Sequence, residues 1–189
     1  MSLRSPSDPF HIRPPPRIYL AGPDVFFRDS EAIFKSLVAF CETLGLQGVP
    51  PSDGGIAADQ RLGDEERAQR IYESNIQLIR EADGVIANLA PFRGQEPDSG
   101  TVFEVGFATA LGKPVVAYGV APGTYADRVC ATIDCHTGAD GVIRERASGV
   151  MVEGLGQRLN LMLTRSTAIA ESAEAALARL ARLLHAGQR

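Results

Sequence analysis

Residues 98–114 have the sequence DSGTVFEVGFATALGKP, which predicts a mostly buried helix with defined ends. Asp98 or Ser99 can accept hydrogen bonds from the first free backbone N–H groups, and Gly112 with the proline two residues later predicts the end of the helix. Between these ends Glu104 is the only charged residue. A surface helix normally carries a polar face. The segment therefore predicts a helix packed against a sheet on one side and against other protein on the other.

Glu104 has no basic partner one turn away on this helix, because those positions hold Gly100, Thr101, Phe107 and Ala108. A carboxylate among apolar groups is uncommon, and burial should raise its pKa. Acids with shifted pKa values concentrate at active sites but also occur in structural networks. Two interpretations therefore stay open from these residues alone: Glu104 lies on a narrow strip that reaches water, or it is a functional carboxylate.

The composition is that of an ordinary soluble domain. The 189 residues are 44% hydrophobic and 22% charged, enough for one domain with its own core. The net charge of −4 argues against a general nucleic-acid binder. No apolar run approaches the roughly 18 residues of a membrane span, and no signal peptide opens the chain. The three cysteines form no disulfide framework, so we expect a cytoplasmic protein that binds no membrane.

Strands and helices alternate after a polar, proline-rich arm over residues 1–16, which leaves 17–189 as a single domain. Apolar runs predict strands at 17–21, 46–49, 84–89 and 114–118, with a fifth between 142 and 152. Helical periodicity predicts helices at 30–44 and 64–82, the latter with Ile71, Ile76 and Ile79 inward, and a C-terminal helix from about residue 167. The order predicts an α/β fold: a Rossmann-like (flavodoxin-like), doubly wound parallel sheet of about five strands with flanking helices.

Acidic side chains gather at the predicted ligand crevice of this sheet. Ligands of open parallel sheets bind at the carboxyl ends of strands where the strand order reverses, here between the loops 21–27 and 90–98. Asp98 stands at that point, and Glu104 lies about 9 Å further along the helix axis with its side chain leaning back toward it. Asp24 on the opposing loop is a third candidate. Two or three carboxylates around one cleft suit glycosyl chemistry.

Other catalytic patterns are missing from the sequence. Residues 20–24, LAGPD, are not a dinucleotide-binding glycine loop, and neither a P-loop lysine motif nor a Ser-His-Asp nucleophile elbow occurs. The pattern Cys130-x4-Cys135-His136 contains residue types that bind zinc, but it lacks a second ligand pair at conventional spacing. We therefore expect a plain loop there, with no metal.

Six segments, in this order and spacing, carry a resemblance to a known family: 18–23 (IYLAGP) followed by Phe26, 82–89 (ADGVIANL), 91–94 (PFRG), 98–101 (DSGT) with Glu104, 111–114 (LGKP) and 160–163 (NLML). The chain resembles the nucleoside 2-deoxyribosyltransferases from about residue 17 to residue 165. The resemblance implies a Rossmann-like sheet and a base exchange, in which a 2'-deoxyribosyl group moves between nucleobases with retention of configuration. It implies no cofactor, and its ligands are small-molecule deoxynucleosides and free nucleobases.

The resemblance also implies catalytic roles. Glu104 matches the nucleophile that holds the sugar as a covalent glycosyl intermediate, and Asp98 matches an acid that serves proton transfer at the base. Tyr19 matches a tyrosine that positions the nucleophile. Without the resemblance, Tyr19 could be simple core and Asp98 only a helix cap.

Four further residues are implied in substrate binding. Gly22 and Phe26 fall in the loop that lines the nucleoside pocket. Asn160 matches an asparagine that reaches the sugar from a neighbouring subunit, which implies a homo-oligomer (a dimer or larger), although Asn160 could also simply cap a helix. Asn75 stands where some members carry a base-contacting aspartate. An amide cannot supply a proton, so base preference stays open.

Two alternatives compete with transfer. A deoxynucleoside or deoxynucleotide N-glycosidic hydrolase of the same superfamily would use water in place of the second base. The aspartate and aromatics of residues 22–27, GPDVFF, do not suit a phosphate, which favours a free nucleoside. The other alternative is a non-catalytic nucleotide sensor that keeps the fold, with Glu104 merely structural.

Overall fold

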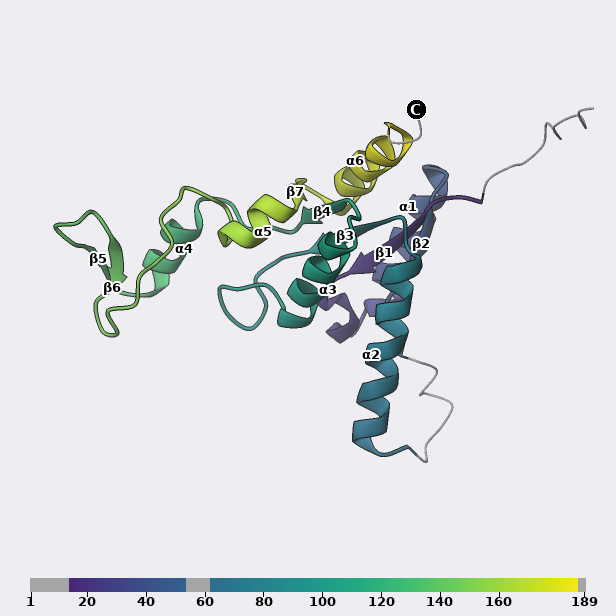
Figure 1. Cartoon of the computed structure of the whole chain (residues 1–189), viewed down its shortest axis with the longest axis horizontal. Helices are drawn as coiled ribbons and strands as arrows, with labels where there is room; N and C mark the ends of the chain where they lie inside the picture. Colours follow the sequence, from purple (N-terminus) through teal and green to yellow (C-terminus); the bar gives the residue numbers. More distant parts are fainter. Residues whose placement is uncertain (1–13, 54–61, 187–189) are drawn as a thin grey trace, which may run out of the picture.

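The computed structural model, which describes residues 14–53 and 62–186, is built around one parallel sheet (Figure 1). Its five strands lie in the order β2–β1–β3–β4–β7, and every neighbouring pair is parallel. The strands are β1 (Arg17–Ala21), β2 (Gln47–Val49), β3 (Gly84–Asn88), β4 (Val115–Tyr118) and β7 (Ala168–Ile169). This flavodoxin-like order confirms the predicted α/β fold.

Helices cover both faces of this sheet. They are the short 3-10 helix η1 (Pro23–Phe26), α1 (Ser30–Thr43), α2 (Asp64–Glu81), α3 (Ser99–Ala110), α5 (Leu161–Ser166) and α6 (Ala173–Ala186). Successive side chains of a strand point to opposite faces, and β1 shows this directly. Ile18 and Leu20 lie in the core with α1 and α6, whereas Tyr19 lies in the core with α2, α3 and α5. The inner strands β1, β3 and β4 are buried on both faces, which explains their continuous apolar runs, whereas the edge strands β2 and β7 are partly exposed.

A strand does lie between residues 142 and 152, as predicted, but it is not the fifth strand of the main sheet. A small extension projects from the sheet there and contains α4 (Tyr125–Thr132), β5 (Cys135–Thr137) and β6 (Ile143–Glu145) (Figure 1). Strand β6 pairs antiparallel with β5 in a separate two-stranded sheet. The extension has its own core of Ala126, Val129 and Val152, so these apolar residues are buried against one another rather than against the main sheet.

The fifth strand of the main sheet is β7, and α6 therefore begins at Ala173 rather than near residue 167. Ala168 and Ile169 fit the apolar phase of the helix that follows, which is why periodicity concealed the strand. In α2, Ile79 is fully buried as predicted, but Ile71 is 40% exposed and does not point into the core. Within the described ranges, no helix is long and apolar enough to cross a membrane. Most of the predicted N-terminal arm, residues 1–13, lies outside the described residues.

Candidate active site

Helix α3 has the ends that its sequence predicts. Asp98 is the N-cap, and its Oδ2 accepts hydrogen bonds from the backbone N–H of Thr101 at 2.9 Å and from the Thr101 hydroxyl at 3.0 Å. Thr101 is buried, so this pair fixes the first turn firmly. Beyond the last turn Gly112 has a φ of 71°, the left-handed conformation that glycine adopts without strain. The helix therefore holds Glu104 at a defined height above the sheet.

Glu104 is held by a side chain from the strand beneath it. The hydroxyl of Tyr19, on β1, donates to Oε1 of Glu104 at 2.6 Å. The pKa of the Glu104 carboxyl is raised to about 7, because the effect of burial, with a smaller one from the nearby charge of Asp98, outweighs the lowering by the hydrogen bond from Tyr19. Burial and the charge of Glu104 together hold the pKa of Tyr19 far above its ordinary value, so the phenol stays protonated and donates. The predicted rise in the Glu104 pKa is thus confirmed in direction.

The cleft that Glu104 lines has a volume of about 530 Å³. This volume lies in the usual range for a small-molecule site, roughly 300–1,000 Å³. Five of the predicted site residues line it together: Gly22, Phe26, Asn75, Asp98 and Glu104. They come from the loops after β1 and β3 and from helices α2 and α3, as the crossover topology predicts. Tyr19 is fully buried and reaches the cleft only through Glu104.

Asp24, the third acidic candidate, does not join these residues. Its carboxylate is buried, and both of its oxygens accept from the side-chain amide of Asn88 at 3.1 Å. The loop after β1 is thereby fastened to the end of β3. Gly22 lies so close to this pair that a Cβ there would be 2.4 Å from Oδ2 of Asp24 and 2.9 Å from Cβ of Asn88. Only glycine fits at position 22, and the role of Asp24 is to hold the loop.

Phe26 belongs to an aromatic cluster that sequence reasoning missed. Its ring stacks on Phe92 with centroids 5.5 Å apart, and the guanidinium of Arg93 lies 4.8 Å from the Phe92 centroid and 5.8 Å from that of Phe26. Arg93 has a φ of 55°, uncommon for a residue with a side chain. The signal was present in the segment 91–94, PFRG, which follows a strand that ends at the crevice. The cluster joins the two loops that flank the cleft.

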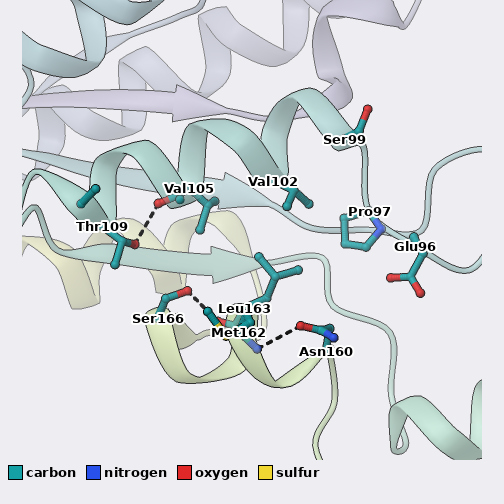
Figure 2. Close-up of a pocket in the computed structure, with 12 residues that line it drawn as sticks. Glu96, Pro97, Ser99, Val102, Val105, Thr109, Asn160, Met162, Leu163 and Ser166 are labelled. Atoms are coloured by element: carbon teal, nitrogen blue, oxygen red, sulfur yellow. Dashed lines mark hydrogen bonds between the residues drawn. The ribbon is translucent and has the colours of Figure 1, made fainter. Parts of the chain in front are cut away.

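Asn160 lies outside this cleft. It caps α5, where its Oδ1 accepts from the backbone N–H of Met162 at 3.0 Å and its Nδ2 donates to Glu153 at 3.1 Å. The residue lines a second, larger cavity of about 670 Å³ between α3 and α5 (Figure 2). Glu104 is not among the residues that line this second cavity, whose walls are mainly apolar. The chemical groups converge on the smaller cleft, which we therefore take as the candidate active site.

The cysteine and histidine pattern divides between two elements of the extension. Cys130 lies in α4, whereas Cys135 and His136 lie in β5. Among the residues that the structure describes, no group of three or more histidine, cysteine, aspartate or glutamate side chains could hold a metal ion.

Comparison with known proteins agrees with this fold. The family model for nucleoside 2-deoxyribosyltransferase matches residues 18–162. The structure of a 2-desoxiribosyltransferase from Leishmania mexicana is similar, with a TM-score of 0.66 and 31% identity over 89% of this chain and 98% of that one. A conserved protein from Enterococcus faecalis shares the fold, with a TM-score of 0.54 and 19% identity over 89% of this chain and 99% of that one.

An uncharacterized protein from Schizosaccharomyces pombe is 34% identical over 115 residues, which are 60% of this chain and 54% of that protein. The chain thus spans about half the length of this curated relative. Because the family model matches residues 18–162, which are most of the chain, the chain belongs to the nucleoside 2-deoxyribosyltransferase family.

Proposed function

We propose that this protein transfers a 2'-deoxyribosyl group between nucleobases through a covalent bond to Glu104, with retention of configuration. The observation that carries the proposal is the state of the Glu104 carboxyl. Oε1 is held by Tyr19, whereas no described residue donates a hydrogen bond to Oε2. A carboxyl that is fixed through one oxygen and lines a cleft has its other oxygen available to attack a sugar carbon.

The proposed exchange has two steps, one for each base. In the first, an oxygen of Glu104 forms a bond to the anomeric carbon as the bond from that carbon to the base nitrogen breaks, and the departing base takes a proton. In the second, the nitrogen of another base forms a bond to the anomeric carbon as the bond from that carbon to the Glu104 oxygen breaks, which restores the carboxylate, and the base releases a proton. Each step inverts the anomeric centre, so the product keeps the starting configuration.

Asp98 is the proposed carrier of that proton. It lines the same cleft as Glu104. Its Oδ2 is occupied by Thr101, whereas no described residue donates a hydrogen bond to Oδ1. We propose that Oδ1 gives its proton to the first base and recovers one from the second.

Trapping of the intermediate tests the nucleophile. A deoxynucleoside with a 2'-fluorine should leave its sugar on the enzyme as a covalent intermediate that breaks down slowly. Peptide mass spectrometry should then find this sugar on the peptide that contains Glu104. The Glu104→Gln variant is the control and should carry no label. A sugar attached elsewhere, or no sugar with a substrate that is turned over, contradicts the assignment.

Turnover with and without a second base separates transfer from hydrolysis. Deoxyadenosine with added hypoxanthine should give deoxyinosine, and release of adenine should be slow when the acceptor is left out. Release at the same rate without an acceptor would favour the hydrolase. Neither product would favour a nucleotide sensor.

We further propose that the protein is a homo-oligomer in which Asn160 completes the cleft of a neighbouring subunit. In its own subunit Asn160 lines the cavity between α3 and α5 rather than the cleft with Glu104 (Figure 2). Glu104→Gln and Asn160→Ala subunits should each be inactive alone, and a mixture should regain activity because mixed oligomers hold intact sites. A mixture that stays inactive, or a monomer in light scattering, contradicts the shared site.

A further inference from the structure

Asn75 makes a two-point contact with the backbone of a loop far from it in sequence. Its Oδ1 accepts from the backbone N–H of Ser52 at 2.8 Å, and its Nδ2 donates to the carbonyl oxygen of the same residue at 3.1 Å. Asn75 lies on α2, whereas Ser52 lies in the loop after β2. Both bonds are part-buried, so water competes less for them than at an open surface.

An amide is required for this contact. Its oxygen and nitrogen match one acceptor and one donor to the N–H and C=O of a single residue. Aspartate could still accept from the Ser52 N–H, but its second oxygen would face the Ser52 carbonyl oxygen, where two acceptors repel. The contact with Ser52 therefore requires asparagine rather than aspartate at position 75.

This loop forms part of the cleft wall. Pro51, Ser52 and Asp53 all line the cleft, together with Asn75 itself. We propose that Asn75 is a positioning residue that holds residues 51–53 in place as a wall of the nucleoside site. The kinetic part of this inference rests on the proposed function, whereas the contact with Ser52 does not.

Amide hydrogen exchange followed by NMR tests the contact without turnover. In Asn75→Ala, exchange of the Ser52 amide should quicken by about tenfold or more, because loss of one hydrogen bond has an effect of this order. In Asn75→Asp the acceptor remains, so the Ser52 amide should keep more of its protection than in Asn75→Ala. Gln77→Glu is the matched control, because it adds the same charge to the same helix and alters an amide bond to Glu81 outside the cleft. Unchanged exchange in Asn75→Ala would overturn the inference.

Equilibrium binding of deoxyadenosine and thymidine tests the consequence of the contact. Both Asn75 variants should weaken both ligands by about fivefold or more, whereas Gln77→Glu should leave both Kd values as in the wild type. The kcat should fall less than the KM rises, since Glu104 and Asp98 are untouched. Faster Ser52 exchange with unchanged Kd values would overturn the positioning role. A wild-type protein that binds nucleosides without turning them over would instead contradict the proposed function and leave this role standing.

Discussion

Replacing Tyr19 by phenylalanine removes one hydroxyl and should shift the pH at which the enzyme works. The hydroxyl donates to Glu104 at 2.6 Å and lowers the pKa of its carboxyl, which burial nevertheless keeps at about 7 with this bond in place. A hydrogen bond to a charged group contributes about 1.5–3 kcal/mol, and one pKa unit corresponds to about 1.4 kcal/mol. The pKa of Glu104 should therefore rise by about one to two units. At pH 7 the ionised fraction would fall from about one half to about 1–10%.

The pH dependence of kcat/KM measures this shift, because it reports the ionisation of the free enzyme. In the proposed reaction Glu104 attacks as the carboxylate, so activity should rise with pH through the Glu104 pKa, and the acidic limb of the Tyr19→Phe profile should move to higher pH. Tyr125→Phe is the matched control, since Tyr125 donates to Glu96 at 2.5 Å at the surface. It should leave the limb unchanged. An acidic limb that stays in place in Tyr19→Phe, or moves to lower pH, would refute the reasoning.

Three further predictions concern stability and affinity. Burial raises the pKa of Glu104 from 4.5 to about 7, so the folded state binds the Glu104 proton more tightly than the unfolded state does. The stabilisation that comes from this proton is complete below about pH 4.5 and is lost as the pH rises through 7. Glu104→Gln should therefore be more stable than wild type by about 3 kcal/mol in urea unfolding at pH 8, and equal to it at pH 4. Asp98→Ala removes the N-cap of α3 and should lower the free energy of unfolding by about 1 kcal/mol, with a much larger loss of turnover. A loss of turnover that, expressed as a free energy, is no larger than the loss in the free energy of unfolding would contradict the proposed role of Asp98 in proton transfer to the base. Arg93→Ala removes the cation beside the ring of Phe26 and should raise the nucleoside KM by about two- to fivefold at constant kcat, whereas Arg93→Lys should fall between it and wild type.

The central fold was predictable because each signal was local. The strands β1, β3 and β4 are apolar runs between glycines and prolines, and α3 carries its own cap and stop residues. The strand β7 was not predicted, because it has only two residues, Ala168 and Ile169, at the edge of the sheet. So short a strand has no periodicity of its own, and its pattern merged with that of the helix after it.

The candidate site was predictable only in part. Topology placed Asp98 and Glu104 at one crevice, because parallel strands end at the same edge of a sheet. Sequence could not say which way the carboxylate of Asp24 turns, since a loop side chain is oriented by whichever partner tertiary structure supplies. The bond from Asn75 to the backbone of Ser52 was equally out of reach, because it joins a helix to a loop 23 residues away. Such contacts leave no periodic trace in a sequence.

Helix α3 separates two hollows of the molecule. One side of the helix contributes Gly100, Thr101 and Glu104 to the smaller hollow, and another contributes Val102 and Val105 to the larger. A helix with its side chains is only about 10 Å thick, so no second layer of protein lies between them. Substitutions that fill or enlarge the larger hollow therefore act on the helix that carries Glu104. Substitutions among the apolar residues of the larger hollow therefore offer engineering a way to shift Glu104 without changing a residue that lines the smaller one.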